Sequence, residues 1–187
     1  MKVVSNSVRT LMLATALSVG ALGFAAPSFA QDPVTVGGAP MYANKNIVEN
    51  AVNSKDHTTL VAAVKAAGLV ETLQGKGPFT VFAPTNEAFA ALPAGTVDTL
   101  LKPENKEMLT HILTYHVVAG DMSSEDLMKG KMVNMTTVSG DALTAQMKGK
   151  DLVITDETGK SAKVTIADVN QSNGVIHVVD RVLMPKM

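Results

Sequence analysis

The hydrophobic period of the chain changes once along its length, near Gly130. Before that glycine, apolar residues such as Ile47, Val48 and Ala51 recur three or four positions apart, which is the spacing of an amphipathic helix. After it, apolar and polar residues alternate, as in the stretch ALTAQM that begins at Ala142, which is the spacing of a half-buried strand. Helices followed by a meander of strands predict an α+β domain rather than alternating βαβ units.

Two short turns and one apolar run complete the strand prediction. KGK at residues 148–150 and DETGK at residues 156–160 separate the alternating stretches, so we expect hairpins there. VIHVVDRVLM, residues 175–184, is apolar on both faces, which predicts a central strand covered on both sides.

Residues 1–30 have the features of a secretory signal peptide. Lys2 and Arg9 precede the apolar run TLMLATALSVGALGF, and small residues lead to a cleavage point after Ala30. The run is too short and wrongly flanked for a membrane anchor. We therefore expect a secreted protein, periplasmic or extracellular, that is soluble and has no membrane span once the signal is removed.

The remaining part, about 150 residues, has the size of one domain. Residues 31–43 are rich in Pro and Gly without a helical period, so we expect a flexible leader there. Residues 44–187 then form the single domain. Because the chain has no cysteine, packing alone must hold that domain in an oxidising compartment. The net charge of −1 gives no indication of nucleic-acid or anionic-membrane binding.

The stretch GPFTVFAPTNEAF, Gly77 to Phe89, runs a short strand through Pro84 directly into a helix. A nucleophile elbow needs G-x-S-x-G at such a junction, and a phosphate loop needs several glycines and a lysine, and neither pattern occurs. A structural interpretation explains the residues instead: Thr85 or Asn86 caps the helix, and Phe89 folds back on the strand. We expect a hinge of the fold at this junction and no chemical site.

Within this stretch, TVFAPTNEAF resembles the first signature segment of the fasciclin domain family. NGVIHVVDRVLMP, residues 173–185, resembles the second, and the pair Tyr115-His116 lies between the two as in that family. The resemblance extends from about Asn44 to Pro185, and the single-domain layout is similar to that of the small secreted bacterial members. It implies a fasciclin-like wedge of about seven strands in a sandwich-like β core, with several helices packed around it.

The resemblance also implies a function. Family members are secreted or surface-exposed and take part in adhesion or matrix contact, with no common catalytic centre or cofactor. We therefore expect a non-enzymatic adhesion or interaction module without a cofactor, a monomer whose partner is a cell-surface or matrix protein or a polysaccharide. The alternative is a carrier of a small apolar ligand, carotenoid-like as in a few algal members, because a wedge packed with aliphatic and Met side chains could open a groove.

Two pairs of residues are adhesion candidates by this resemblance. Tyr115 and His116 form the pair assigned to integrin contact in animal relatives, but the alternation in YHVV equally predicts a buried packing pair. Asp168 and Val169 stand where some animal relatives carry a Glu-Pro-Asp-Ile-Met adhesion motif, of which only the Asp is identical. An aspartate that ends a strand before the turn at residues 173–174 is the alternative interpretation.

The remaining candidates are structural or metal-binding. We expect a framework role for the signature residues Thr85, Asn86, Phe89, Asn173, Gly174 and His177. The four histidines do not pair at helical spacing, so they indicate no metal site. Four methionines lie close together in the sequence: Met122, Met128, Met132 and Met135. Their thioethers could bind Cu(I), fill gaps in a core that lacks Trp, or form an adaptable surface for protein contact.

Overall fold

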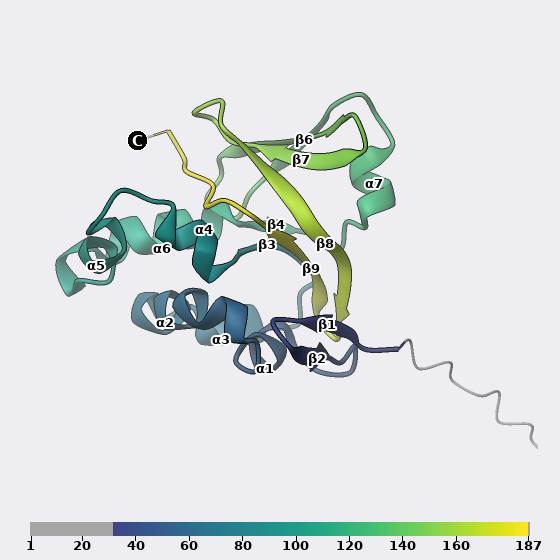
Figure 1. Ribbon diagram of the computed structural model, residues 1–187. Coiled ribbons are helices and arrows are strands. Elements are labelled where there is room, and N and C mark those ends of the chain that lie inside the picture. The colour runs from purple at the N-terminus through teal and green to yellow at the C-terminus, as the bar shows by residue number, and fades with distance from the viewer. Residues whose placement is uncertain (1–31, 187) are drawn as a thin grey trace, which may run out of the picture.

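The computed structural model describes residues 32–186, and the predicted signal peptide therefore lies outside the described residues (Figure 1). The α-helices are α1 (Ile47–Ala51), α2 (Thr58–Ala67), α3 (Val70–Gln74), α4 (Asn86–Ala90), α5 (Thr96–Leu100), α6 (Lys106–Tyr115) and α7 (Ser124–Met128), with 3-10 helices η1 (Lys55–His57) and η2 (Pro103–Asn105). The strands are β1 (Val34–Val36), β2 (Ala39–Met41), β3 (Phe79–Pro84), β4 (Val117–Ala119), β5 (Val133–Thr136), β6 (Ala142–Lys148), β7 (Asp151–Thr155), β8 (Ser161–Gln171) and β9 (Gly174–Val179). The predicted α+β class is confirmed.

Seven of the strands form one mixed sheet in the order β4-β3-β9-β8-β7-β6-β5. All pairs are antiparallel except β3 with β9, which run parallel. Strand β9 lies inside the sheet and all six of its residues are buried, as the apolar run of the sequence predicted, but the strand ends at Val179 and does not extend over the rest of the run to Met184. The predicted hairpins connect β6 to β7 and β7 to β8.

The sheet curls until its two edge strands meet. Val118 of β4 forms a bridge with Thr137, just after β5, and the N–H of Val138 donates to the carbonyl of Val117 at 2.7 Å. Strand β8 shifts register twice as it pairs with β9, and such bulges bend a strand and increase its twist. Two halves of one sheet thus face each other across a core, as two layers of a sandwich would.

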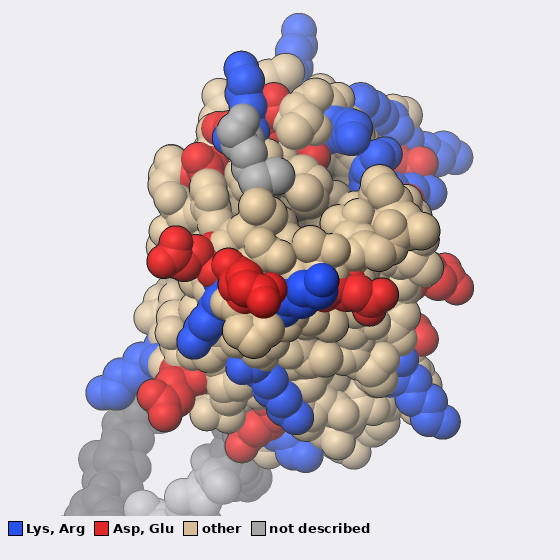
Figure 2. Space-filling view, turned by 90° about the vertical axis from the view of Figure 1, so that its left-hand side faces the viewer, with Lys and Arg blue, Asp and Glu red and all other residues tan. Residues whose placement is uncertain are grey.

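The curled sheet has apolar residues on both sides. Its inside is filled by a cluster that includes Phe82, Tyr115 and Leu143. Its other side is covered by α1 to α6, which pack on the left and below the sheet in Figure 1 and share a second cluster with β3 and β9. From this helical side, acidic side chains form a band across the middle, whereas Lys and Arg gather at the upper right (Figure 2). None of the described helices has the length and apolar character needed to cross a membrane.

The prediction of a flexible leader over residues 31–43 was wrong for its central part. Strands β1 and β2 form a hairpin there, and the side chains of Val36 and Met41 are buried in the helix-side core. Gly37 and Gly38 take up left-handed backbone conformations in the turn, as a two-residue hairpin requires. The Pro and Gly content that suggested flexibility instead specifies a tight turn next to two buried anchors.

Candidate functional site

The two signature segments, far apart in the sequence, lie side by side as β3 and β9. In this parallel pair Phe79 stands opposite Gly174 and Phe82 opposite His177, whose ring stacks on the phenyl ring with centroids 5.8 Å apart. A Cβ on Gly174 would lie 1.9 Å from the carbonyl oxygen of Phe79, at a φ of +151°. Only glycine lets the two backbones approach this closely.

Asn173 fastens the start of β9 to two helices. Its Oδ1 accepts from the N–H of Ile47 at 3.0 Å, and its Nδ2 donates to the carbonyls of Leu73 and Gly75 at 2.8 and 2.9 Å. These bonds satisfy backbone groups at the start of α1 and the end of α3, where helices leave such groups without intrahelical partners. The amide is fully used in holding architecture.

At the junction after β3, the two candidate caps have separate tasks. Thr85 is the N-cap of α4, and its Oγ1 accepts from the N–H of Ala88 at 3.3 Å. The Oδ1 of Asn86 accepts from the N–H of Thr59 at 3.0 Å, and its Nδ2 donates to the carbonyl of Lys55 at 2.7 Å. Asn86 therefore ties α4 to η1 and α2.

His177 is buried and held as the neutral ring. Its Nε2 lies 2.8 Å from the carbonyl oxygen of Met122, which can only accept, and its Nδ1 accepts from the N–H of Asp168 at 3.3 Å. Burial lowers the pKa of His177 below its usual value. The ring thus links β9 to the β8 bulge and to the segment before α7.

Phe89 is also part of the framework, since its ring is buried in the helix-side core. The side chains of Thr85, Asn86 and His177 end at three different places: the first turn of α4, the η1–α2 junction and the segment before α7. They do not converge on a common point where a substrate could sit.

Tyr115 is the last residue of α6, and its side chain has no exposed surface. The phenol donates to the carbonyl of Ala142 at 2.9 Å and accepts from the N–H of Glu157 at 3.0 Å. Burial raises the pKa of Tyr115 to about 12. The ring and its hydroxyl join α6 to β6 and to the β7–β8 turn.

His116 follows it and is only 2% exposed. Its Nδ1 lies 2.8 Å from the carbonyl oxygen of Ile112, and its Nε2 accepts from the N–H of Leu183 at 2.9 Å. Burial lowers the pKa of His116 to about 4. Because Tyr115 and His116 are both buried, a direct contact of this pair with a partner is incompatible with the fold.

The second adhesion candidate is divided between surface and core. Asp168 is partly exposed, has a φ of +57°, and accepts from the N–H of Ser124 at 2.7 Å and from its hydroxyl. Val169 is buried. Asp168 thus holds the β8 bulge against the first turn of α7, and Val169 offers no contact surface.

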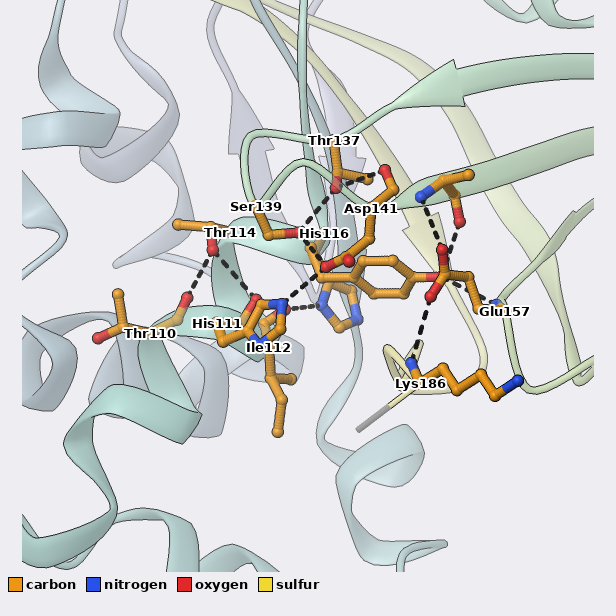
Figure 3. A network of polar contacts seen from close by, with 12 residues as sticks. Thr110, His111, Ile112, Thr114, His116, Thr137, Ser139, Asp141, Glu157 and Lys186 are labelled. Carbon is orange, nitrogen blue, oxygen red and sulfur yellow. Dashed lines mark hydrogen bonds and ion pairs between the residues drawn. The ribbon is translucent and has the colours of Figure 1, made fainter.

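A polar network that the sequence analysis did not predict joins α6 to the β5–β6 turn (Figure 3). His111 Nε2 lies 2.7 Å from Asp141 Oδ2, and the hydroxyl of Ser139 donates to the same oxygen at 2.8 Å. The hydrogen bond from the Ser139 hydroxyl, and to a smaller extent the one with His111, lowers the pKa of Asp141. A nucleophilic serine relay places the histidine between serine and aspartate. Here the aspartate stands between the other two, so the arrangement fastens elements and activates no hydroxyl.

Asp156, a buried carboxylate, was also missed. Its Oδ1 accepts from both the N–H and the hydroxyl of Thr158 and from the N–H of Lys160, and its Oδ2 accepts from the N–H of Met184 at 3.1 Å. The signal was present in DETGK, because an aspartate that opens a turn often bonds to the backbone two residues on. What the turn sequence could not indicate is the distant partner, Met184.

The structure does not gather the four candidate methionines in one environment. Met135 is buried and Met122 packs partly buried against the same inner cluster, whereas Met128 is 40% and Met132 60% exposed. Within residues 32–186, no three His, Cys, Asp or Glu side chains come together in a way that could hold a metal ion.

An apolar hollow lies between α1, α2 and α3, with Val48, Val61 and Val70 among its lining residues. Its volume is about 30 Å³. Pockets that hold drug-sized ligands have volumes of roughly 300–1,000 Å³. A carotenoid-like ligand does not fit into this hollow as it stands.

The family model for the fasciclin domain matches residues 55–185. The chain belongs to the fasciclin domain family. The chain is 47% identical over 178 residues to protein sll1483 of Synechocystis sp., covering 92% of this chain and 94% of that protein. It is 34% identical over 161 residues to the cell surface glycolipoprotein MPB83 of Mycobacterium bovis, covering 83% and 68%.

A solved structure shares the fold of this fasciclin domain. It is a pair of FAS1 domains from the insect cell adhesion molecule Fasciclin I, with a TM-score of 0.53 and 23% identity, covering 67% of this chain and 43% of that one. The family assigned from the sequence and the predicted fold are both confirmed.

Proposed function

We propose that this fasciclin domain is a secreted, non-enzymatic interaction module through which a cell contacts another surface. The observation that carries the proposal is the use of the polar signature residues. The polar side chains of these residues form hydrogen bonds with other parts of the same fold: Asn173, Asn86, His177, Tyr115 and His116. The family segments thus specify a scaffold, and recognition falls to its outer surface.

The names of two similar proteins support the same role. MPB83 is described as a cell surface glycolipoprotein, and the insect protein as a cell adhesion molecule. The features of residues 1–30 support export, to the periplasm or beyond. A single small domain offers about 800 Å² to a partner, so we expect weak individual contacts that add up when many copies are displayed.

Attachment of cells to a surface tests the proposal. A strain that lacks the gene should attach less, and the full chain should restore attachment. The matched control is the chain without residues 2–30, which keeps every described residue but loses the predicted export signal and should not restore attachment. If the deletion strain and its parent attach equally well to abiotic and to polysaccharide-coated surfaces, the proposal is wrong.

A further inference from the structure

The outward face of β6, β7 and β8 is polar except at Val153 in the middle of β7. On β6, Leu143 and Ala145 point into the inner core, so the residues between them point outward. The strand registers place the outward residues in three rows: Thr144, Thr155 and Ser161; Gln146, Val153 and Lys163; and Lys148 with Asp151. Hydroxyl, amide and ammonium groups therefore alternate over neighbouring strands.

Lysine side chains lie across this face rather than away from it. Lys148 Nζ donates to Ser161 Oγ at 3.0 Å, and Lys163 Nζ lies 2.9 Å from Asp151 Oδ1. To reach Ser161, the Lys148 side chain must cross the row of Val153, which is only 7% exposed although it faces outward. Lysines that lie along a surface in this way bury their aliphatic stems against apolar neighbours and keep the charged ends in water, which accounts for the low exposure of Val153.

Exposed positive charge lies on this face, in the turns at the two ends of β7 and just after β9, and most of it is unpaired. Among the described residues, Lys148, Lys150, Lys160 and Arg181 are exposed and take part in none of the three ion pairs. Lys and Arg gather at the upper right of Figure 2, on the upper part of the molecule where Figure 1 has β6, β7 and β8. The whole chain carries a net charge of −1, so the positive charges gathered here are a local excess.

A hollow of about 350 Å³ adjoins the face at Ser161. Asp180 and Arg181 line it together with Ala88, Ala91 and Leu92. A guanidinium matches a carboxylate or sulfate with two parallel hydrogen bonds, and a neighbouring carboxylate such as that of Asp180 accepts from sugar hydroxyls. The volume lies within the range of ligand pockets.

We propose that this basic face, defined as Lys148, Lys150, Lys160, Lys163 and Arg181, binds an acidic polysaccharide and that the hollow takes one acidic sugar of it. The inference rests on the proposed function, because it names the kind of partner. Polysaccharide fits better than a membrane, since Val153 is covered and the rows offer no large apolar side chain for insertion. It fits better than single-stranded nucleic acid, since no row of the face contains an aromatic residue on which bases could stack.

Direct binding tests the inference with the purified protein without residues 1–30. The probes are polygalacturonate, dextran sulfate, neutral dextran and phosphatidylglycerol vesicles. We expect binding to the two acidic polymers at about 20 mM NaCl that weakens strongly at about 300 mM, because salt screens exposed charges. Neutral dextran should not bind. Binding to vesicles alone, or to neither acidic polymer at low salt, would overturn the inference.

A matched pair of double variants locates the site. K148Q/R181Q removes two charges from the basic face, and K76Q/K102Q removes two exposed charges outside it. The first should weaken polymer binding about tenfold and the second less than about twofold, with equal unfolding midpoints for both. Equal weakening by the two would contradict the assigned site.

The outcomes separate this inference from the proposed function. If K148Q/R181Q restores attachment to the deletion strain on an acidic polysaccharide surface as fully as the wild type, the basic face is wrong while the adhesive role stands. If the polymers bind the purified protein but deletion leaves attachment unchanged, the face is right and the adhesive role fails.

Discussion

The backbone N–H of Leu183 donates to Nε2 of His116 at 2.9 Å, which joins the C-terminal segment to the end of α6. The opposite ring nitrogen faces the carbonyl oxygen of Ile112, so the bond to Leu183 exists only while the ring is neutral. His116, part of the Tyr115-His116 pair, is therefore a buried structural residue whose hydrogen bond to Leu183 is lost when the ring is protonated.

This hydrogen bond predicts that the protein loses stability in mild acid. The unfolded histidine takes up a proton as pH falls through about 6.5, whereas the pKa of folded His116 is lowered to about 4, so protons favour the unfolded chain between these values. The contribution is full above pH 6.5 and falls by on the order of 3 kcal/mol as pH 4 is approached. Burial lowers the pKa of His57 and His177 too, which acts in the same direction.

Urea unfolding at pH values between 7.5 and 4.5 measures this loss. The variant His116→Gln should be less stable at pH 7.5 but should show a shallower decline below pH 6.5. A decline as steep in the variant as in the wild type would exclude His116 as the acid-sensitive group.

Asn173→Ala should destabilise the fold by about 3 kcal/mol, because it removes the partner of buried backbone groups of Ile47 and Leu73 and of the partly buried carbonyl of Gly75. The matched control is Asn134→Ala on the exposed face of β5, which loses only a bond to Thr144 and should cost less than about 0.5 kcal/mol. The urea midpoint at constant m-value measures both. Similar midpoints for the two variants would contradict the framework role of Asn173.

Tyr115→Phe should cost about 1–2 kcal/mol, since it removes the phenol that pairs with Ala142 and Glu157 while keeping the ring. Tyr115→Ala also opens a cavity and should cost about 4 kcal/mol. Attachment of cells that carry Tyr115→Phe should equal that of the wild type, because the side chain has no exposed surface. A folded Tyr115→Phe protein that no longer supports attachment would show that the hydroxyl does more than hold the structure.

Gly174→Ala should prevent stable folding, with a loss above about 4 kcal/mol, because its Cβ would lie 1.9 Å from a backbone oxygen of Phe79. Gly149→Ala is a suitable comparison, since Gly149 also has a positive φ but no atom within 4 Å of an added Cβ. That variant should lose only about 1 kcal/mol of conformational strain. Soluble yield and thermal midpoint distinguish the two, and a well-folded Gly174→Ala would refute the close approach.

Local patterns predicted β6, β7 and β8, because each alternates with a period of two and ends in a turn that the sequence specifies, and an apolar run predicted β9. Strand β5 is short and was not predicted. Local patterns could not predict that β9 pairs in parallel with β3, since the partner of a strand about a hundred residues away leaves no local signal. The β1–β2 hairpin was missed for a related reason. The stretch VGGAP is compatible with a loose leader or with a tight turn, and only the burial of Val36 and Met41 in the fold shows that it is a turn.

The same limit applies to the site. The capping role at Thr85 follows from its position between a strand and a helix, whereas His116 and Asp156 each have one partner in the C-terminal segment that only the fold reveals. The basic face results from the register in which β6, β7 and β8 pair. Lys148 and Lys163 belong to different strands and share a surface because β7 pairs with both neighbours.

The contact between the two edge strands, β4 and β5, affects how the sheet can pair with other copies of the chain. An open strand edge is a template on which another copy can add its own strand, and this is how many β-rich proteins begin to form fibrils. At the bridge between Val118 and Thr137 each edge already has the other as its neighbour. At this point of the sheet, neither edge therefore offers its backbone groups to a strand of another copy.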